Sequence, residues 1–123
     1  MTTSRINKSE TGLIGEILAK KFLRKKGYTI IEQNFRTKYS EMDLVVKKKD
    51  VLVFVEVRTK TSEYFGSPEE TINKHKINRL VRSAQAYISY NQYSGNARID
   101  AICIVLNPDA SPNRITHYES ITL

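Results

Sequence analysis

The chain has 123 residues, 40% of them hydrophobic and 27% charged, which fits one folded domain and excludes a wholly disordered chain. No apolar run approaches the roughly 20 residues of a membrane span, and the N-terminal segment is too polar for a secretory signal, so we expect a cytoplasmic protein without a membrane partner. Twenty lysines and arginines against 13 acidic residues give a net charge of +7, which favours a polyanionic partner such as nucleic acid.

The first predicted element is a helix. It follows a polar tail at residues 1–10 that we expect to be disordered, and residues 11–123 are predicted to form the domain. Thr11 suits the N-cap, and Gly27 follows a basic last turn, as is common where a helix ends. Apolar residues at helical spacing predict the buried face, namely Leu13, Ile14, Ile17, Leu18 and Phe22.

Three strands are predicted next, at residues 28–36, 41–47 and 51–58, because these segments are rich in β-branched and aromatic residues. The lysine-rich segment 47–50 reads as a hairpin turn between the second and third strands. Valines occupy alternate positions of the third strand, and Leu52 and Phe54 lie on its other face. Both faces are apolar for most of its length, so this strand is predicted to be central.

The C-terminal half begins with a loop, and a second helix is predicted from Ser67 and Pro68 to about Tyr90. Residues 97–106 form another predicted strand, and residues 114–123 form a final edge strand. Cys103 lies in the apolar part of segment 97–106, where we expect it to be a small buried side chain. The order αβββαββ, without repeats or a linker, predicts a single α/β domain.

Two carboxylates interrupt the apolar strands. Asp43 lies on the second strand and Glu56 on the third, and the predicted hairpin brings them within one step of facing each other. A buried pair of like charges is unfavourable without a cation. One interpretation is a shared divalent metal, with Arg58 and Lys60 as nearby cations. The other is an ion pair between Glu56 and Arg58, with Asp43 bonded to a lysine, and the spacing alone leaves both open.

Other chemistries find little support. The sequence has no glycine-rich phosphate loop and no zinc-ligand spacing, and its two histidines, His75 and His117, lie far apart. Glu16 lies on the first helix with Lys20 four residues later, so its spacing by itself indicates an exposed helical ion pair.

Four stretches together resemble the YraN family and cover roughly residues 12–106: "GLIGEILAKKFLRKKGYTIIEQNFR", "EMDLVV", "LVFVEVRTK" and "FGSPEETINKHKINRLVRSAQAYI". That family is similar to the PD-(D/E)xK nuclease superfamily, near the Holliday-junction resolvases. The resemblance implies a restriction-endonuclease-like domain with a mixed central sheet flanked by helices. It implies that Asp43 and Glu56 bind one or two Mg²⁺ or Mn²⁺ ions, with support from Glu16. The superfamily's catalytic lysine falls on Arg58.

Basic and aromatic residues around this region are candidates for DNA contacts. The basic candidates are Arg36, Lys60, Lys74, Lys76 and Arg79. Tyr39, Tyr64 and Phe65 flank the expected site and can stack on an unpaired base, although for Phe65 we expect packing of the loop against the sheet.

The leading hypothesis is a metal-dependent endonuclease that acts on branched DNA such as a four-way junction, working as a symmetric homodimer. A second hypothesis is a nucleic-acid-binding module of the same fold without cleavage, which Arg58 favours because a guanidinium does not lose its proton. A third is an adaptor that docks a protein of a DNA-processing complex.

Overall fold

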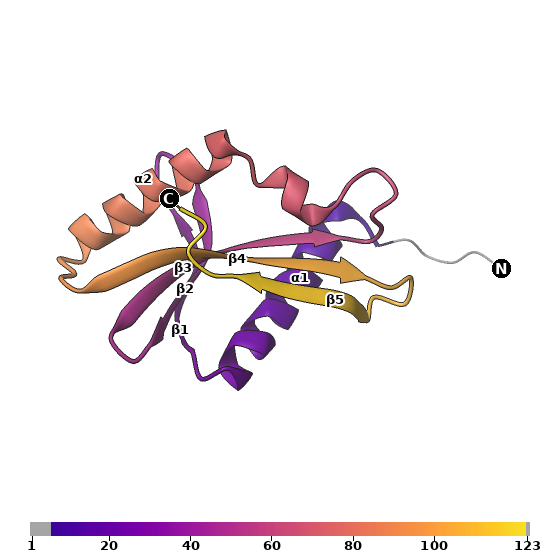
Figure 1. Cartoon of the computed structure of the whole chain (residues 1–123), viewed down its shortest axis with the longest axis horizontal. Coiled ribbons are helices and arrows are strands. Elements are labelled where there is room, and N and C mark those ends of the chain that lie inside the picture. The colour runs from indigo at the N-terminus through magenta and orange to yellow at the C-terminus, as the bar shows by residue number, and fades with distance from the viewer. Residues whose placement is uncertain (1–5, 123) are drawn as a thin grey trace.

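The computed structural model describes residues 6–122, so residues 1–5, half of the tail expected to be disordered, lie outside the described residues. Two helices and five strands follow the predicted order: α1 (Lys8–Lys25), β1 (Thr29–Arg36), β2 (Glu41–Lys48), β3 (Val51–Lys60), α2 (Lys74–Tyr90), β4 (Asn96–Leu106) and β5 (Pro112–Tyr118). A short 3₁₀ turn, η1 (Pro68–Thr71), precedes α2 (Figure 1). The protein is therefore of the α/β class, as predicted.

The five strands form one mixed sheet in the order β1-β2-β3-β4-β5. Only β3 and β4 run parallel; the other three neighbouring pairs are antiparallel. The central place of β3 and the edge position of β5 confirm two predictions. The last strand is shorter than predicted, because Ser120 has a positive φ of 53° and its N–H bonds the Asp100 side chain instead of a strand. Cys103 is buried in β4, as expected.

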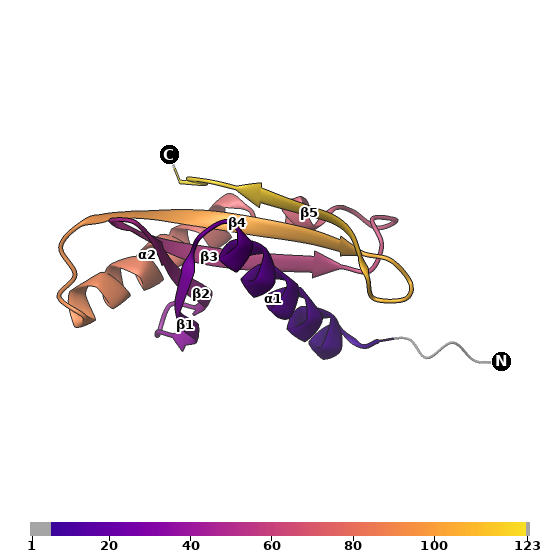
Figure 2. The same ribbon diagram turned by 90° about the horizontal axis from the view of Figure 1, so that it is seen from below.

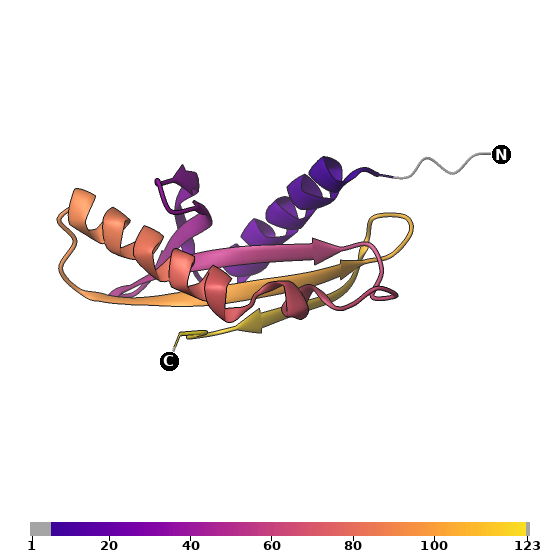
Figure 3. The same cartoon turned by 90° about the horizontal axis from the view of Figure 1, so that it is seen from above.

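The two helices pack on opposite faces of the sheet (Figures 2 and 3). Ala19 and Leu23 of α1 join a buried cluster with Val53 and Val55 of β3. On the other face the buried cluster contains Leu80, Ala84 and Tyr87 of α2 together with Leu52 and Phe54 of β3. The two faces of β3 thus contribute to two separate cores, as its alternating pattern predicted.

The start and buried face of α1 differ from the prediction. Asn7 is the N-cap and accepts a bond from the Glu10 N–H, so the helix begins four residues earlier than expected. The buried positions are Thr11, Gly15, Ala19 and Leu23. Leu13 and Ile17, predicted to be buried, are 61% and 53% exposed.

Gly15 explains why α1 turns these positions, rather than Leu13 and Ile17, toward the sheet. A Cβ atom at residue 15 would overlap the Thr59 side chain of β3, so only glycine lets α1 approach the strand this closely on that side. The stripe of small residues faces the sheet, and two of the larger apolar residues are left at the surface.

The second helix, unlike the first, begins later than predicted. Ser67 and Pro68 open only η1, where the Glu70 carboxylate accepts a bond from the Ser67 N–H. The helical conformation then ends at Ile72. Asn73 caps α2 by accepting a bond from the Lys76 N–H at 2.8 Å. Lys76 therefore lies in the first turn of α2 rather than within a longer helix.

The pairing between β2 and β3 is limited to the part of the two strands near their turn. Lys48 pairs with Val51 across a two-residue turn, and the described pairing ends at Leu44 and Val55. The ribbons of β1 and β2 turn steeply away from those of β3, β4 and β5 (Figures 2 and 3). Within residues 6–122, neither helix has the length and apolar character that a membrane crossing requires.

Candidate functional site

Asp43 and Glu56 lie together where the pairing between β2 and β3 ends. One step beyond the last paired residues, Leu44 and Val55, leads to Asp43 on one strand and Glu56 on the other. Asp43 Oδ2 accepts a hydrogen bond from the Val57 N–H at 2.8 Å, which holds the carboxylate against β3. The structure therefore brings together the two acids that the hairpin predicted to be neighbours.

The surroundings of Asp43 favour its protonated form. Burial raises the pKa of this carboxyl most, and the neighbouring Glu56 and then Glu16 raise it further, to about 8. The bond from the Val57 N–H only partly opposes them. At neutral pH the pair therefore holds a proton, whose place a metal cation can take.

Glu56 is 3% exposed, and its two oxygens have different partners. Oε2 lies 2.8 Å from an Arg58 Nη2 and 3.6 Å from Lys76 Nζ. Oε1 is buried and, among the described residues, has no hydrogen-bond partner. The predicted ion pair with Arg58 is present, whereas Asp43 bonds a backbone N–H and not the lysine that the same interpretation required.

Glu16 approaches this pair from α1. Burial, Glu41 and Glu56 raise the pKa of its carboxyl, and a bond from the Asn34 side chain partly offsets them. Lys20, its expected helical partner, donates to Gln33 Oε1 at 2.9 Å. In the part of the chain that the structure describes, no three His, Cys, Asp or Glu side chains cluster closely enough to form a metal site. Glu16 therefore acts on the acid pair through its charge rather than as a third member of a preformed cluster.

Lys76 belongs to the site although its sequence pattern indicated only a DNA contact. Its ammonium lies near Glu56, and its side chain is 15% exposed. Asn73 caps α2 and places Lys76 in its first turn, four residues before the buried Leu80, whereas the approach of that turn to Glu56 depends on how α2 packs on the sheet. The two cations of the site thus come from different elements, Arg58 from β3 and Lys76 from α2.

Three hydroxyl groups tie the start of β2 to α2. Ser83, which is fully buried, lies 2.8 Å from Thr37 Oγ1 and 2.6 Å from Ser40 Oγ. The turn before β2 is therefore bound to the helix that carries Lys76, which fixes Asp43 and Lys76 relative to each other.

The remaining candidates for DNA contacts lie around this centre. Lys74 and Arg79 are exposed on α2, and Arg36 is exposed and pairs with Glu41 at 3.0 Å. Phe65 is 90% exposed, so the expectation that it packs against the sheet is wrong. Phe65 lies inside a tight turn that is closed by a bond from the Gly66 N–H to the Glu63 carbonyl, and this turn leaves its ring at the surface.

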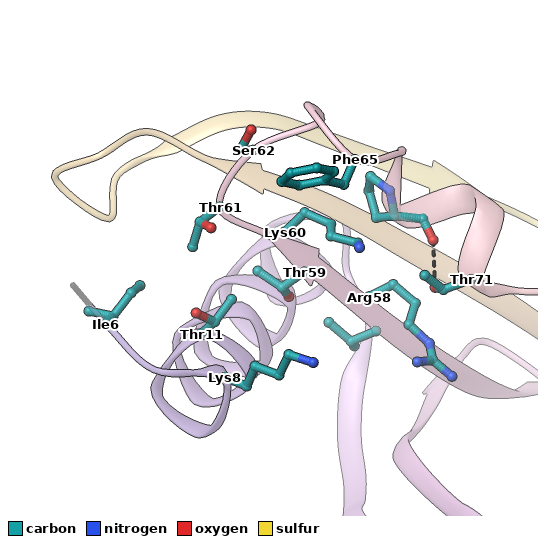
Figure 4. A pocket seen from close by; sticks show the side chains of 13 residues that line it. Ile6, Lys8, Thr11, Arg58, Thr59, Lys60, Thr61, Ser62, Phe65 and Thr71 are labelled. Atoms are coloured by element: carbon teal, nitrogen blue, oxygen red, sulfur yellow. Dashed lines mark hydrogen bonds between the residues drawn. The ribbon is translucent and has the colours of Figure 1, made fainter.

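A pocket of about 530 Å³ adjoins the acid pair at the end of β3 (Figure 4). Arg58 connects the two regions, because it bonds Glu56 and also lines the pocket. Lys60, a predicted DNA contact, lines the pocket as well.

Residues 15–104 match the model of the family described as uncharacterised protein family UPF0102. The chain belongs to this family. The match includes both carboxylates of the pair, Arg58 and Lys76, and it confirms the resemblance to the YraN family.

Individual relatives agree with the family match. A UPF0102 protein of Caldanaerobacter subterraneus is 44% identical over 108 residues, which cover 85% of this chain and 87% of the relative. A UPF0102 protein of Syntrophomonas wolfei is 45% identical over 109 residues, covering 88% and 93%. A third, from Clostridium botulinum, is 38% identical over 100 residues, covering 80% and 81%. These relatives match this chain over most of its length and theirs.

Proposed function

We propose that this UPF0102 protein is a metal-dependent endonuclease with a restriction-endonuclease-like fold, acting on branched DNA such as four-way junctions. The observation that carries the proposal is the pairing of Asp43 with Glu56 at the opening between β2 and β3. Structural carboxylates are normally satisfied by donors, whereas this pair contains one acid of raised pKa and one buried oxygen, Glu56 Oε1, without a partner among residues 6–122.

These residues fit a hard divalent cation. Mg²⁺ takes oxygen ligands, keeps several waters and commonly needs only one or two protein carboxylates together with substrate phosphate. Asp43 and Glu56 would hold it, and the raised pKa of Asp43 means that binding displaces a proton. When bound, the ion supplies Lewis-acid chemistry to phosphodiester hydrolysis. Glu16 would strengthen the negative potential that attracts the ion.

Arg58 and Lys76 divide the role of the superfamily's catalytic lysine. The Arg58 guanidinium keeps its proton and can bind phosphate oxygens as a planar fork. Lys76 supplies an ammonium 3.6 Å from Glu56 Oε2, although it comes from α2 and not from β3. Both would neutralise charge that develops on the phosphate during cleavage.

A second candidate is a DNA-binding module of the same fold that does not cleave. The favouring observation is that Glu56 Oε2 already contacts both Arg58 and Lys76, so the site contains its own cations. This function predicts salt-dependent DNA binding that is indifferent to Mg²⁺. The adaptor function predicts instead little affinity for free DNA at physiological salt.

The test combines calorimetry with cleavage. Mn²⁺ and Mg²⁺ are titrated into the wild type, Asp43→Asn and Glu56→Gln, each with and without a non-cleavable four-way junction, and a labelled cleavable junction is then incubated with each protein. We expect ion binding and cleavage by the wild type and a loss of both, at least 100-fold, in each variant. Asp50→Asn, which removes an exposed turn carboxylate, is the matched control and should behave as the wild type.

The outcomes separate the candidates. Normal cleavage by Asp43→Asn would show that the site assignment is wrong. Junction binding by the wild type without ion binding or cleavage would favour the non-cleaving module. A symmetric dimer is expected on the junction, because a four-way junction requires two paired cuts, and its stoichiometry is measured in the same titration.

A further inference from the structure

The pocket beside the acid pair is basic. It lies between the N-terminal end of α1, the end of β3 and the loop that follows β3, with Thr59 between Lys8 and Phe65 in the close view (Figure 4). Among the described residues that line it, Lys8, Arg58 and Lys60 are cationic and none is acidic. Its volume of about 530 Å³ falls in the range of roughly 300–1,000 Å³ that small-molecule sites occupy.

Two neighbouring aromatic residues beside this pocket are largely exposed. Tyr64 is 84% exposed and Phe65, which lines the pocket, is 90% exposed. Their ring centroids lie 4.7 Å apart in an edge-to-face arrangement. Exposure of two adjacent large rings is unfavourable in water, and such patches mark binding surfaces.

The loop that carries these rings is anchored. Glu63 accepts a bond from Arg114 Nη2 of β5 at 2.9 Å, and the same guanidinium bonds Glu69 of η1. The bonds from Arg114 lower the pKa of Glu69 to about 2, so this anchor stays charged over the neutral range. Within the loop, the Tyr64 N–H bonds Ser62 Oγ at 3.0 Å. The rings are therefore held in their exposed position before any ligand binds, which reduces the entropy lost on binding.

Aromatic rings beside cations match the chemistry of one ligand class. A nucleobase presents a π-face to the rings, and its phosphate requires positive charge. In a fully paired duplex the base faces are stacked inside the helix, so only an unpaired nucleotide can reach Phe65 with its base. Arg58 links the pocket to Glu56, which places such a nucleotide next to the acid pair.

We propose that this pocket binds one unpaired nucleotide of a DNA strand, with the base stacked on Phe65 and in edge contact with Tyr64, and a phosphate neutralised by Lys60 and Lys8. The inference rests on the proposed function for DNA as the ligand. It deepens that function by naming the substrate class, which is DNA with an unpaired nucleotide at the cleavage position. A continuous duplex would not fill the pocket.

The test measures binding without a divalent ion, so it does not depend on cleavage. Fluorescence anisotropy compares a short labelled oligothymidine strand with a blunt duplex of equal length for the wild type, Phe65→Ala and Tyr64→Ala. Stacking on an aromatic side chain is worth about 1–3 kcal/mol per base, so Phe65→Ala should weaken single-strand binding roughly 5- to 150-fold. Duplex binding should change less than about twofold, because the backbone contacts remain.

Tyr90→Ala is the matched control, because Tyr90 is 82% exposed at the far end of α2 and does not line the pocket. It should bind both DNAs as the wild type does. A second measurement uses 2-aminopurine at an unpaired position, whose fluorescence reports stacking directly. Wild type should alter its emission, and Phe65→Ala should not.

Each result decides the proposal. Single-strand binding that is unchanged in Phe65→Ala and Tyr64→Ala, or weakened equally in Tyr90→Ala, would overturn it even if the wild type cleaves junctions. Loss of single-strand binding confined to the loop variants would support the pocket even if no cleavage is found. The pocket and the endonuclease can therefore fail separately.

Discussion

Asp43 and Asp100 are two aspartates in the same sheet with opposite environments. Asp100 on β4 is fully buried and has four donated contacts: two from Arg98 at 3.0 and 3.2 Å, one from His117 at 2.8 Å and one from the Ser120 N–H at 3.0 Å. Asp43 has one backbone donor, and its neighbour is another carboxylate. Burial opposes the charge of both, yet the pKa of Asp100 is lowered, whereas that of Asp43 is raised.

The difference separates an acid whose charge is satisfied by donors from one whose charge is not. The donors of Asp100 outweigh its burial, so its charge contributes to the stability of the fold. Asp43 lacks enough donors, and the fold tolerates an acid that it does not satisfy. The same chemical group thus stabilises the fold on β4 and remains short of donors on β2, where we propose that it binds a cation.

The largest expected effect is on stability. Asp100→Asn removes the anion that Arg98 and His117 surround, and we expect unfolding in urea at pH 7 to show a loss of about 3–5 kcal/mol. Asp43→Asn should not destabilise the protein at the same pH. A similar loss in both variants would contradict the contrast between the two acids.

The next prediction concerns the difference in stability between Asp43→Asn and the wild type, and how that difference depends on pH. Because the pKa of Asp43 is raised in the folded protein, the folded state retains a proton that the unfolded chain releases above about pH 4. The wild type therefore loses stability as the pH rises toward 8, and Asp43→Asn should gain on the order of 1–3 kcal/mol over it at pH 8 but little at pH 4. Thermal unfolding between these pH values measures the gap, which should widen steadily; a constant gap would sink the assignment.

Metal binding should release the proton that Asp43 retains at neutral pH. If Mn²⁺ or Mg²⁺ displaces it, calorimetry at pH 6.5 in PIPES and in ACES should give heats that differ by the buffers' ionisation enthalpies, with about one proton released per site. Affinity should rise by up to about tenfold per pH unit below the pKa of Asp43. Equal heats in both buffers would mean that Asp43 is already ionised.

The smallest expected effect concerns the exposed ion pair between Arg36 and Glu41. Glu41 pairs with Arg36 at 3.0 Å, but their side chains are 37% and 76% exposed, so Arg36→Ala should change the free energy of unfolding by less than about 1 kcal/mol. If Arg36 contacts DNA phosphate, the same variant should flatten the salt dependence of binding by about one charge. A large loss of stability in Arg36→Ala would show that this exposed ion pair contributes to the fold as much as the buried contacts of Asp100 do.

Local patterns predicted the order of helices and strands along the chain, the hairpin that joins β2 to β3 and the closeness of Asp43 to Glu56, because alternation and a short turn determine register. They did not predict the position of Lys76, which depends on where α2 meets the sheet. The exposed position of Leu13 depends on the approach of Gly15 to Thr59, a contact between distant segments.

Asp100 shows the limit of the carboxylate signal. It interrupts an apolar strand as Asp43 and Glu56 do, and only the partners supplied by Arg98, His117 and Ser120 distinguish its role. Arg98 lies two residues away on the same strand, but His117 and Ser120 come from positions that the sequence pattern does not connect with Asp100. A buried acid in a strand therefore indicates that a partner exists, and the structure decides whether that partner is a protein group.

The bond between the Val57 N–H and Asp43 gives the site a reporter of its own. This amide lies two residues beyond the last residue of β3 that pairs with β2, and it donates to the side chain that the proposed ion would bind. Any ligand that draws Asp43 away releases the Val57 N–H. The chemical shift and hydrogen-exchange rate of a single backbone amide would then read out occupancy of the site, without a label and without a substrate.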